Sequence, residues 1–124
     1  MTQPLALVVY ERLLPGTQLI NRLQDMNYRV LGVTDAATLL TCAQQEKPMV
    51  VLADLVSTKN NVCAAIETMK RSPDTQHIPV VAIAPDDAAE LQKSARAAGV
   101  ALIVSETAVL GHLPQFLEQA LQIE

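Results

Sequence analysis

Aromatic side chains are nearly missing from this sequence. It has no Trp, one Phe (Phe116) and two tyrosines, Tyr10 and Tyr28. Proteins that bind nucleic acid by base stacking need exposed rings, so this composition argues against that class. A core of Leu, Val, Ile and Ala instead suits a twisted parallel sheet covered by helices.

Positive charge is also sparse. Nine Lys and Arg residues stand against thirteen Asp and Glu residues, which gives a formal net charge of −4. This balance offers no basic patch for a phosphate backbone, so we expect no nucleic-acid partner. The pair Lys70-Arg71 falls at the end of a predicted helix, where positive charge favours the helix dipole.

Long apolar runs and cysteine clusters are absent as well. The first apolar run, Leu5–Val9, is too short for a signal peptide or a membrane span, so we expect a cytoplasmic protein with no membrane partner. The two cysteines, Cys42 and Cys63, lack metal-type spacing. We expect both to be buried or half-buried thiols on neighbouring helices, without a disulfide.

What the sequence does contain is an alternation of apolar runs with amphipathic stretches. Half of the 124 residues are apolar and 18% are charged, which predicts one globular domain over residues 1–124. The alternation predicts an α/β fold with a parallel sheet. The predicted strands are Leu5–Val9, Arg29–Val33, Met49–Ala53, Ile78–Ala84 and Ala101–Ser105.

The stretches between these strands are predicted as helices. Their expected last residues are Asn27, Gln45, Lys70, Ala98 and Leu121. Leu14–Thr17 is predicted as a turn before the first helix, and Pro85 as the start of the fourth. Thr34 or Asp35 can cap the second helix, and Gly99 can close the fourth.

Ligand sites in parallel sheets lie where the strands end. The residues that follow the predicted strands include Tyr10, Glu11, Thr34, Asp35, Asp54, Ala84, Pro85, Ser105 and Glu106. The sequence has no glycine-rich dinucleotide loop, no Walker-type phosphate loop and no nucleophile elbow. The two histidines, His77 and His112, are expected at the surface, so we predict that the chain is not an enzyme.

Three segments together resemble the receiver domain of two-component response regulators. Pro48–Leu55 (PMVVLADL) resembles the receiver segment that carries the phosphoacceptor aspartate. His77–Ala84 (HIPVVAIA) resembles the fourth strand of receivers, and Ala97–Gly99 resembles the turn before their fifth strand. The resemblance extends from about Leu5 to Leu121. It implies a flavodoxin-like α/β three-layer sandwich, with a five-stranded parallel sheet of order 2-1-3-4-5 and helices on both faces.

The resemblance also implies a phosphorylation chemistry. A histidine kinase would transfer a phosphoryl group to Asp54, beside a magnesium ion held by an acidic pair, by the aspartate and by a backbone carbonyl. The matching positions for the metal are Glu11, Asp54 and Val56, with Tyr10 in place of the first acid. The implied cofactor is therefore magnesium, on a weakened set of ligands.

Several matching positions depart from the family pattern. Ala84 replaces a Ser or Thr, Glu106 replaces a lysine, Thr107 replaces a proline and Ile103 replaces an aromatic residue. A phosphoryl group of about −2 charge would face the Glu106 carboxylate, and each such interaction is worth about 2–4 kcal/mol at an effective dielectric constant near 20. We predict that phosphorylation of the usual regulated kind does not operate, although Arg12 and Lys59 are alternative cations.

Two interpretations of this carboxylate-rich edge stay open. Glu11, Asp54 and Glu106 could converge as a three-carboxylate group that binds a divalent cation or raises the pKa of one member. Alternatively, they form a solvated acidic rim.

Three functions are compatible with the sequence. The first is a pseudo-receiver that acts through protein–protein contacts or as a homodimer. Its interaction surface would lie on the fourth helix, fifth strand and last helix, with Leu91, Arg96, Leu102 and Ile103, unless flanking helices bury both faces of that strand. The second is an atypical receiver that a histidine kinase phosphorylates at Asp54. The third, with least support, is a flavodoxin-like enzyme or small-molecule binder at the same edge.

Overall fold

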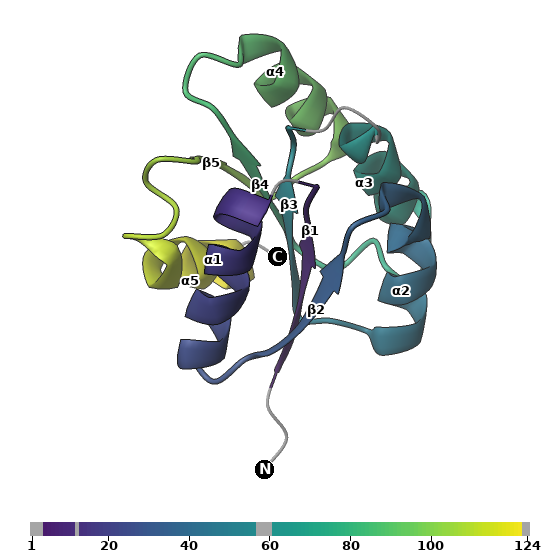
Figure 1. Cartoon of the computed structure of the whole chain (residues 1–124). Coiled ribbons are helices and arrows are strands. Elements are labelled where there is room, and N and C mark those ends of the chain that lie inside the picture. Colours follow the sequence, from purple (N-terminus) through teal and green to yellow (C-terminus); the bar gives the residue numbers. More distant parts are fainter. Residues whose placement is uncertain (1–3, 12, 57–60, 123–124) are drawn as a thin grey trace.

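The computed structural model describes residues 4–11, 13–56 and 61–122, and these form one five-stranded parallel sheet (Figure 1). The strand order is β2-β1-β3-β4-β5, and all four pairings are parallel. The predicted fold and strand order are therefore confirmed. The strands are β1 (Leu5–Val9), β2 (Arg29–Val33), β3 (Val50–Asp54), β4 (Val80–Ala84) and β5 (Leu102–Ser105).

Helices cover both faces of the sheet. α1 and α5 lie on one face, and α2, α3 and α4 lie on the other (Figure 1). Because successive side chains of a strand point to opposite faces, the central strands feed two separate cores and read as continuous apolar runs. The helices are α1 (Leu13–Asp25), α2 (Leu39–Glu46), α3 (Val62–Arg71), α4 (Ala89–Ala98) and α5 (Leu113–Gln122).

Three strands differ from their predicted bounds. β3 extends from Val50 to Asp54, so the candidate aspartate is the last residue of the strand. β4 begins at Val80, because the Ile78 N–H donates to the Thr75 carbonyl within the preceding turn and Pro79 has no N–H. β5 begins at Leu102, one residue later than predicted.

Two helices begin elsewhere than predicted. Leu14–Thr17, predicted as a turn, forms the first turn of α1, where a proline is tolerated. α4 begins at Ala89 because Pro85 and the residues after it form a separate turn, in which the Ala88 N–H donates to the Pro85 carbonyl.

The last residue of α1 and the start of α2 also differ from prediction. α1 ends at Asp25, because Asn27 takes a left-handed conformation (φ 68°) and the Tyr28 N–H donates to the Leu23 carbonyl. α2 is preceded by a 3-10 turn, η1 (Ala36–Thr38), which Asp35 caps by accepting the Ala37 N–H at 3.0 Å.

Helix α3 agrees with prediction on its inward face and at its C-terminal charge. Val62, Ile66 and Met69 are buried, and the helix ends at Lys70-Arg71 as expected. The Lys70 ammonium also donates to the carbonyls of Gln76 and Ile78, and burial lowers its pKa. This lysine therefore ties the end of α3 to the turn before β4.

The predictions for Gly99, the two cysteines and the two histidines are confirmed. Gly99 closes α4 in a left-handed conformation (φ 99°). Cys42 and Cys63 are half-buried free thiols on the neighbouring helices α2 and α3, and burial raises the pKa of Cys63. Both His77 and His112 are exposed. None of the helices among the described residues is long and apolar enough to cross a membrane.

Candidate functional site

Asp54 lies at the centre of the sheet's carboxyl edge, because β3 is flanked by β1 and β4. Its side chain is 1% exposed, and Oδ1 accepts the backbone N–H of Val56 at 3.2 Å. The next residue continues the sheet pairing, since the Leu55 N–H donates to the Ile83 carbonyl at 2.9 Å. The carboxylate therefore stabilises the start of its own loop, which is one ordinary role for an aspartate at a strand end.

Tyr10 is a packing residue rather than a substitute for a metal-binding acid. Its ring lies against two glycines, Gly16 of α1 and Gly32 of β2. A Cβ atom added at Gly16 would lie 2.4 Å from Tyr10 Cδ2, and one at Gly32 would lie 3.0 Å from Cε1. The ring belongs to the core under α1 and α5. The position implied for the first acid thus contributes to the fold.

Ala84 and Glu106 come together as the resemblance implies. Ala84 ends β4 opposite Ser105, and the Glu106 N–H donates to the Ala84 carbonyl at 3.1 Å. The Ala84 methyl is buried, so the position of the implied hydroxyl holds a group that cannot donate a hydrogen bond. Glu106 is half-buried at the edge. The two positions thus meet at this edge through their backbones, with a methyl group and a carboxylate as their side chains.

The turn after β5 contains two hydroxyl groups, those of Ser105 and Thr107, whose mutual contact the sequence did not predict. Ser105 Oγ and Thr107 Oγ1 are 2.7 Å apart, and the Thr107 N–H donates to Ser105 Oγ at 3.2 Å. A proline at position 107 would lack this donor. Thr107, at the position where the resemblance implies a proline, therefore gives the turn its own hydrogen-bonded structure. The sequence signal for this turn is Ser-x-Thr directly after a strand, a pattern typical of an ST-turn.

Metal-binding groups are limited at this edge. Within the described ranges, no group of three or more His, Cys, Asp or Glu side chains could hold a metal ion. The suggestion that Glu11, Asp54 and Glu106 converge as such a group is therefore wrong. Magnesium typically takes one or two carboxylates and keeps several waters, so Glu11, Asp54 and the Val56 carbonyl still have suitable donor chemistry.

The described loops at the carboxyl edge carry acidic residues and no Lys or Arg. Their acidic residues are Glu11, Asp35, Asp54, Asp86, Asp87 and Glu106. The two alternative cations suggested by the sequence, Arg12 and Lys59, lie outside the described residues. The described part of this edge therefore lacks a cationic side chain for an incoming dianion.

The four residues predicted as an interaction surface do not form one apolar patch. Ile103 and Leu91 pack on the core under α2, α3 and α4, whereas Leu102 packs on the opposite face. Leu102 and Ile103 are both half-buried, so the flanking helices cover β5 in part, and Arg96 is exposed on α4.

Searches by sequence find no match among protein-family models or curated proteins. Comparison of the structure with solved structures finds receiver domains. A receiver domain of a Pseudomonas aeruginosa sensor histidine kinase, with magnesium coordinated in its active-site cleft, superposes with a TM-score of 0.87 at 16% identity, covering 98% of this chain and 99% of the other.

Two further receiver structures are similar. A Vibrio cholerae chemotaxis protein gives a TM-score of 0.85 at 16% identity, covering 96% of this chain and 99% of the other. The receiver domain of NtrX from Brucella abortus gives 0.82 at 22% identity, with the same two coverages. At these identities the comparisons establish that the chain has the receiver fold.

Proposed function

Starting from this fold, we propose that the chain is a receiver-like domain of two-component phosphorelay signalling that acts through protein–protein contacts, without the usual aspartyl-phosphate switch. The observation that carries the proposal is that the buried Ala84 and the half-buried Glu106, joined by a backbone hydrogen bond, lie at the same edge of the sheet as Asp54. Phosphoryl transfer depends on positioned cations and hydrogen-bond donors at the developing charge. The described edge offers additional carboxylates instead.

A second candidate is an atypical receiver that a histidine kinase phosphorylates at Asp54. It is favoured by the place of Asp54 at the end of the central strand β3. Glu11, Asp54 and the Val56 carbonyl would hold magnesium in this case. The ion would neutralise part of the phosphoryl charge. The similar Pseudomonas aeruginosa domain binds magnesium in its own cleft.

The proposed contacts involve the surface of α4, β5 and α5, with a signalling protein or a second copy as partner. Arg96 is exposed there, and the half-buried Leu91, Leu102 and Ile103 retain accessible apolar surface. In this proposal the chain is a cytoplasmic binding module with no catalytic residues of its own. For the alternative of a flavodoxin-like enzyme or small-molecule binder at the carboxyl edge, the described residues offer no group of three or more side chains that could hold a metal ion.

The test uses beryllofluoride, which mimics a phosphoryl group on an aspartate. We expect magnesium and beryllofluoride to cause no saturable change in the amide NMR spectrum of the wild-type chain. Asp54→Asn removes the acceptor, and Asp86→Asn is the matched control, because Asp86 is an exposed acid at the same edge. Shifts that occur in the wild type and in Asp86→Asn but vanish in Asp54→Asn would establish the second candidate instead.

A further inference from the structure

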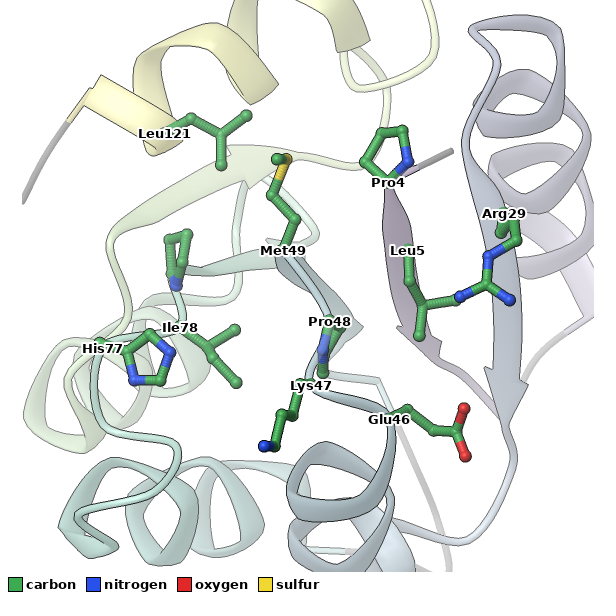
Figure 2. A pocket seen from close by; sticks show the side chains of 11 residues that line it. Pro4, Leu5, Arg29, Glu46, Lys47, Pro48, Met49, His77, Ile78 and Leu121 are labelled. Carbon is green, nitrogen blue, oxygen red and sulfur yellow. The ribbon is translucent and has the colours of Figure 1, made fainter. Parts of the chain in front are cut away.

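The amino edge of the sheet, opposite Asp54, contains a pocket of about 580 Å³. It lies where β1, β2, β3 and β4 begin, and Figure 2 shows its lining. Seven of its eleven lining residues are apolar, among them Leu5, Met49, Ile78 and Leu121. Its size and mostly apolar lining are typical of small-molecule sites in proteins, which have volumes of roughly 300–1,000 Å³.

Met49 marks the pocket as an uncovered apolar surface. Its side chain is 48% exposed, and Leu31 is the only other large apolar side chain described as exposed. Met49 stands near the middle of the lining in Figure 2. A thioether side chain is flexible and adapts to differently shaped apolar ligands. A ligand that covered Met49 would remove this surface from water.

The polar groups of the lining give the pocket an unbalanced charge. Arg29 and Lys47 are cationic and Glu46 is anionic, which leaves a formal charge of +1 when His77 is counted as neutral. Within the described part of the chain, no ion pair joins Arg29 or Lys47 to an acidic side chain. A positive pocket in a chain of net charge −4 is complementary to one negative charge.

Lys47 is held at this pocket in an unusual backbone conformation. It caps α2 with φ 49°, a left-handed conformation that a glycine would adopt without strain, and Pro48 follows it. A lysine at such a position is disfavoured by the fold alone. Its presence in the lining of the pocket is consistent with a binding role.

The adjoining pocket, of about 640 Å³, shares His77 and Pro79 with this one but offers a weaker site. Its lysine, Lys70, already donates to the carbonyls of Gln76 and Ile78 at 3.1 and 2.7 Å. That ammonium is committed to the turn before β4, whereas the cations of the first pocket have no such partner among the described residues.

We propose that the pocket at the amino edge binds a small amphipathic monocarboxylate, with its apolar chain on Met49 and Ile78 and its carboxylate at Arg29, while Lys47 adds to the positive charge of the lining. The single charge of the ligand matches the formal +1 of the lining. The site is independent of the proposed function, because it lies at the opposite edge of the sheet from Asp54.

The test titrates the chain with octanoate and follows the Met49 methyl group by NMR, with the methyl of the buried Met69 as internal reference. We expect saturable shifts at Met49 with a Kd on the order of 1 mM or below. Octanol has the same chain without the charge and should bind about tenfold more weakly. A linear, non-saturating response to octanoate, or equal binding of octanol, would overturn the proposal.

Two variants and a control test the assignment of the carboxylate. Arg29→Gln should weaken octanoate binding about tenfold, and Lys93→Gln, which removes an exposed lysine of α4, should leave it unchanged. Lys47→Gly should also weaken binding while raising thermal stability, because glycine relieves the left-handed strain. If both pocket variants are folded, as judged from their spectra, and bind octanoate as tightly as the wild type, then Arg29 and Lys47 take no part in binding.

Discussion

At the scale of single residues, Tyr10 shows how a position can keep its place in a fold and change its chemistry. Its N–H donates to the Val33 carbonyl at 3.0 Å, so the backbone follows the sheet. The side chain then continues the alternation of β1 toward α1 and α5. Two glycines, Gly16 and Gly32, leave space for the ring.

Gly16→Ala is expected to destabilise the fold by about 1–2 kcal/mol. An added Cβ would meet Tyr10 at Cδ2, Cγ and Cβ, at 2.4, 2.7 and 3.0 Å, which are atoms too close to the backbone for the ring to swing away. Overpacking of this kind typically costs about 1–3 kcal/mol, against a gain in helix propensity of up to about 1 kcal/mol. Urea unfolding of the variant measures the difference.

A double-mutant cycle provides the control for this prediction. In a Tyr10→Ala background the ring is gone, so Gly16→Ala should become neutral or stabilising. Gly32→Ala should be milder in the wild type, because its Cβ would meet the far side of the ring at 3.0 Å. If Gly16→Ala has the same effect in both backgrounds, the Tyr10 contact does not explain the glycine.

At the scale of elements, α3 depends on a cap that its sequence did not reveal. The Asn61 side chain accepts the Ala64 N–H at 3.0 Å, which satisfies one of the free donors at the start of the helix. Asn61→Ala should lower the free energy of unfolding by about 1 kcal/mol, and Asn61→Asp should retain the cap and favour the helix dipole. Equal losses in the two variants, measured by urea unfolding, would contradict the capping role.

The elements were predictable where burial dictates the pattern and not where local hydrogen bonds set a boundary. The strands appear as apolar runs because both faces of the sheet are covered, and Val62, Ile66 and Met69 show the helical spacing of a buried face. The late start of α4 was not predictable, since Pro85 is compatible with a helix start and also with the turn that forms.

The site was predictable in its place and only partly in its geometry. The resemblance located Asp54, Ala84 and Glu106 at one edge, and the pairing of β4 with β5 confirms that the last two meet. The direction of Tyr10 depends on Gly16 and Gly32, residues from other elements, so the sequence around Tyr10 could not reveal it. The amino-edge pocket likewise joins residues from four strand starts and two helices.

At the scale of the whole molecule, the two edges of the sheet differ in charge. The described carboxyl-edge loops are acidic without Lys or Arg, whereas the amino-edge pocket carries a formal charge of +1. The backbone between them matches receiver structures with TM-scores of 0.82–0.87. The fold is thus preserved independently of the chemistry at its edges, because the buried strands and helices specify it.

This separation predicts that side-chain replacement alone can strengthen the binding of a phosphoryl mimic. The double variant Ala84→Ser, Glu106→Lys places a hydroxyl at the end of β4 and an ammonium after β5, on a backbone where Glu106 already bonds to Ala84. Exchanging repulsion for attraction at a half-exposed position should strengthen magnesium-dependent beryllofluoride binding by at least about tenfold, after allowance for solvent screening. Amide NMR shifts measure the gain, and adding Asp54→Asn to the double variant should abolish it. A double variant that folds but binds beryllofluoride no more strongly than the wild type would show that Ala84 and Glu106 do not control this binding.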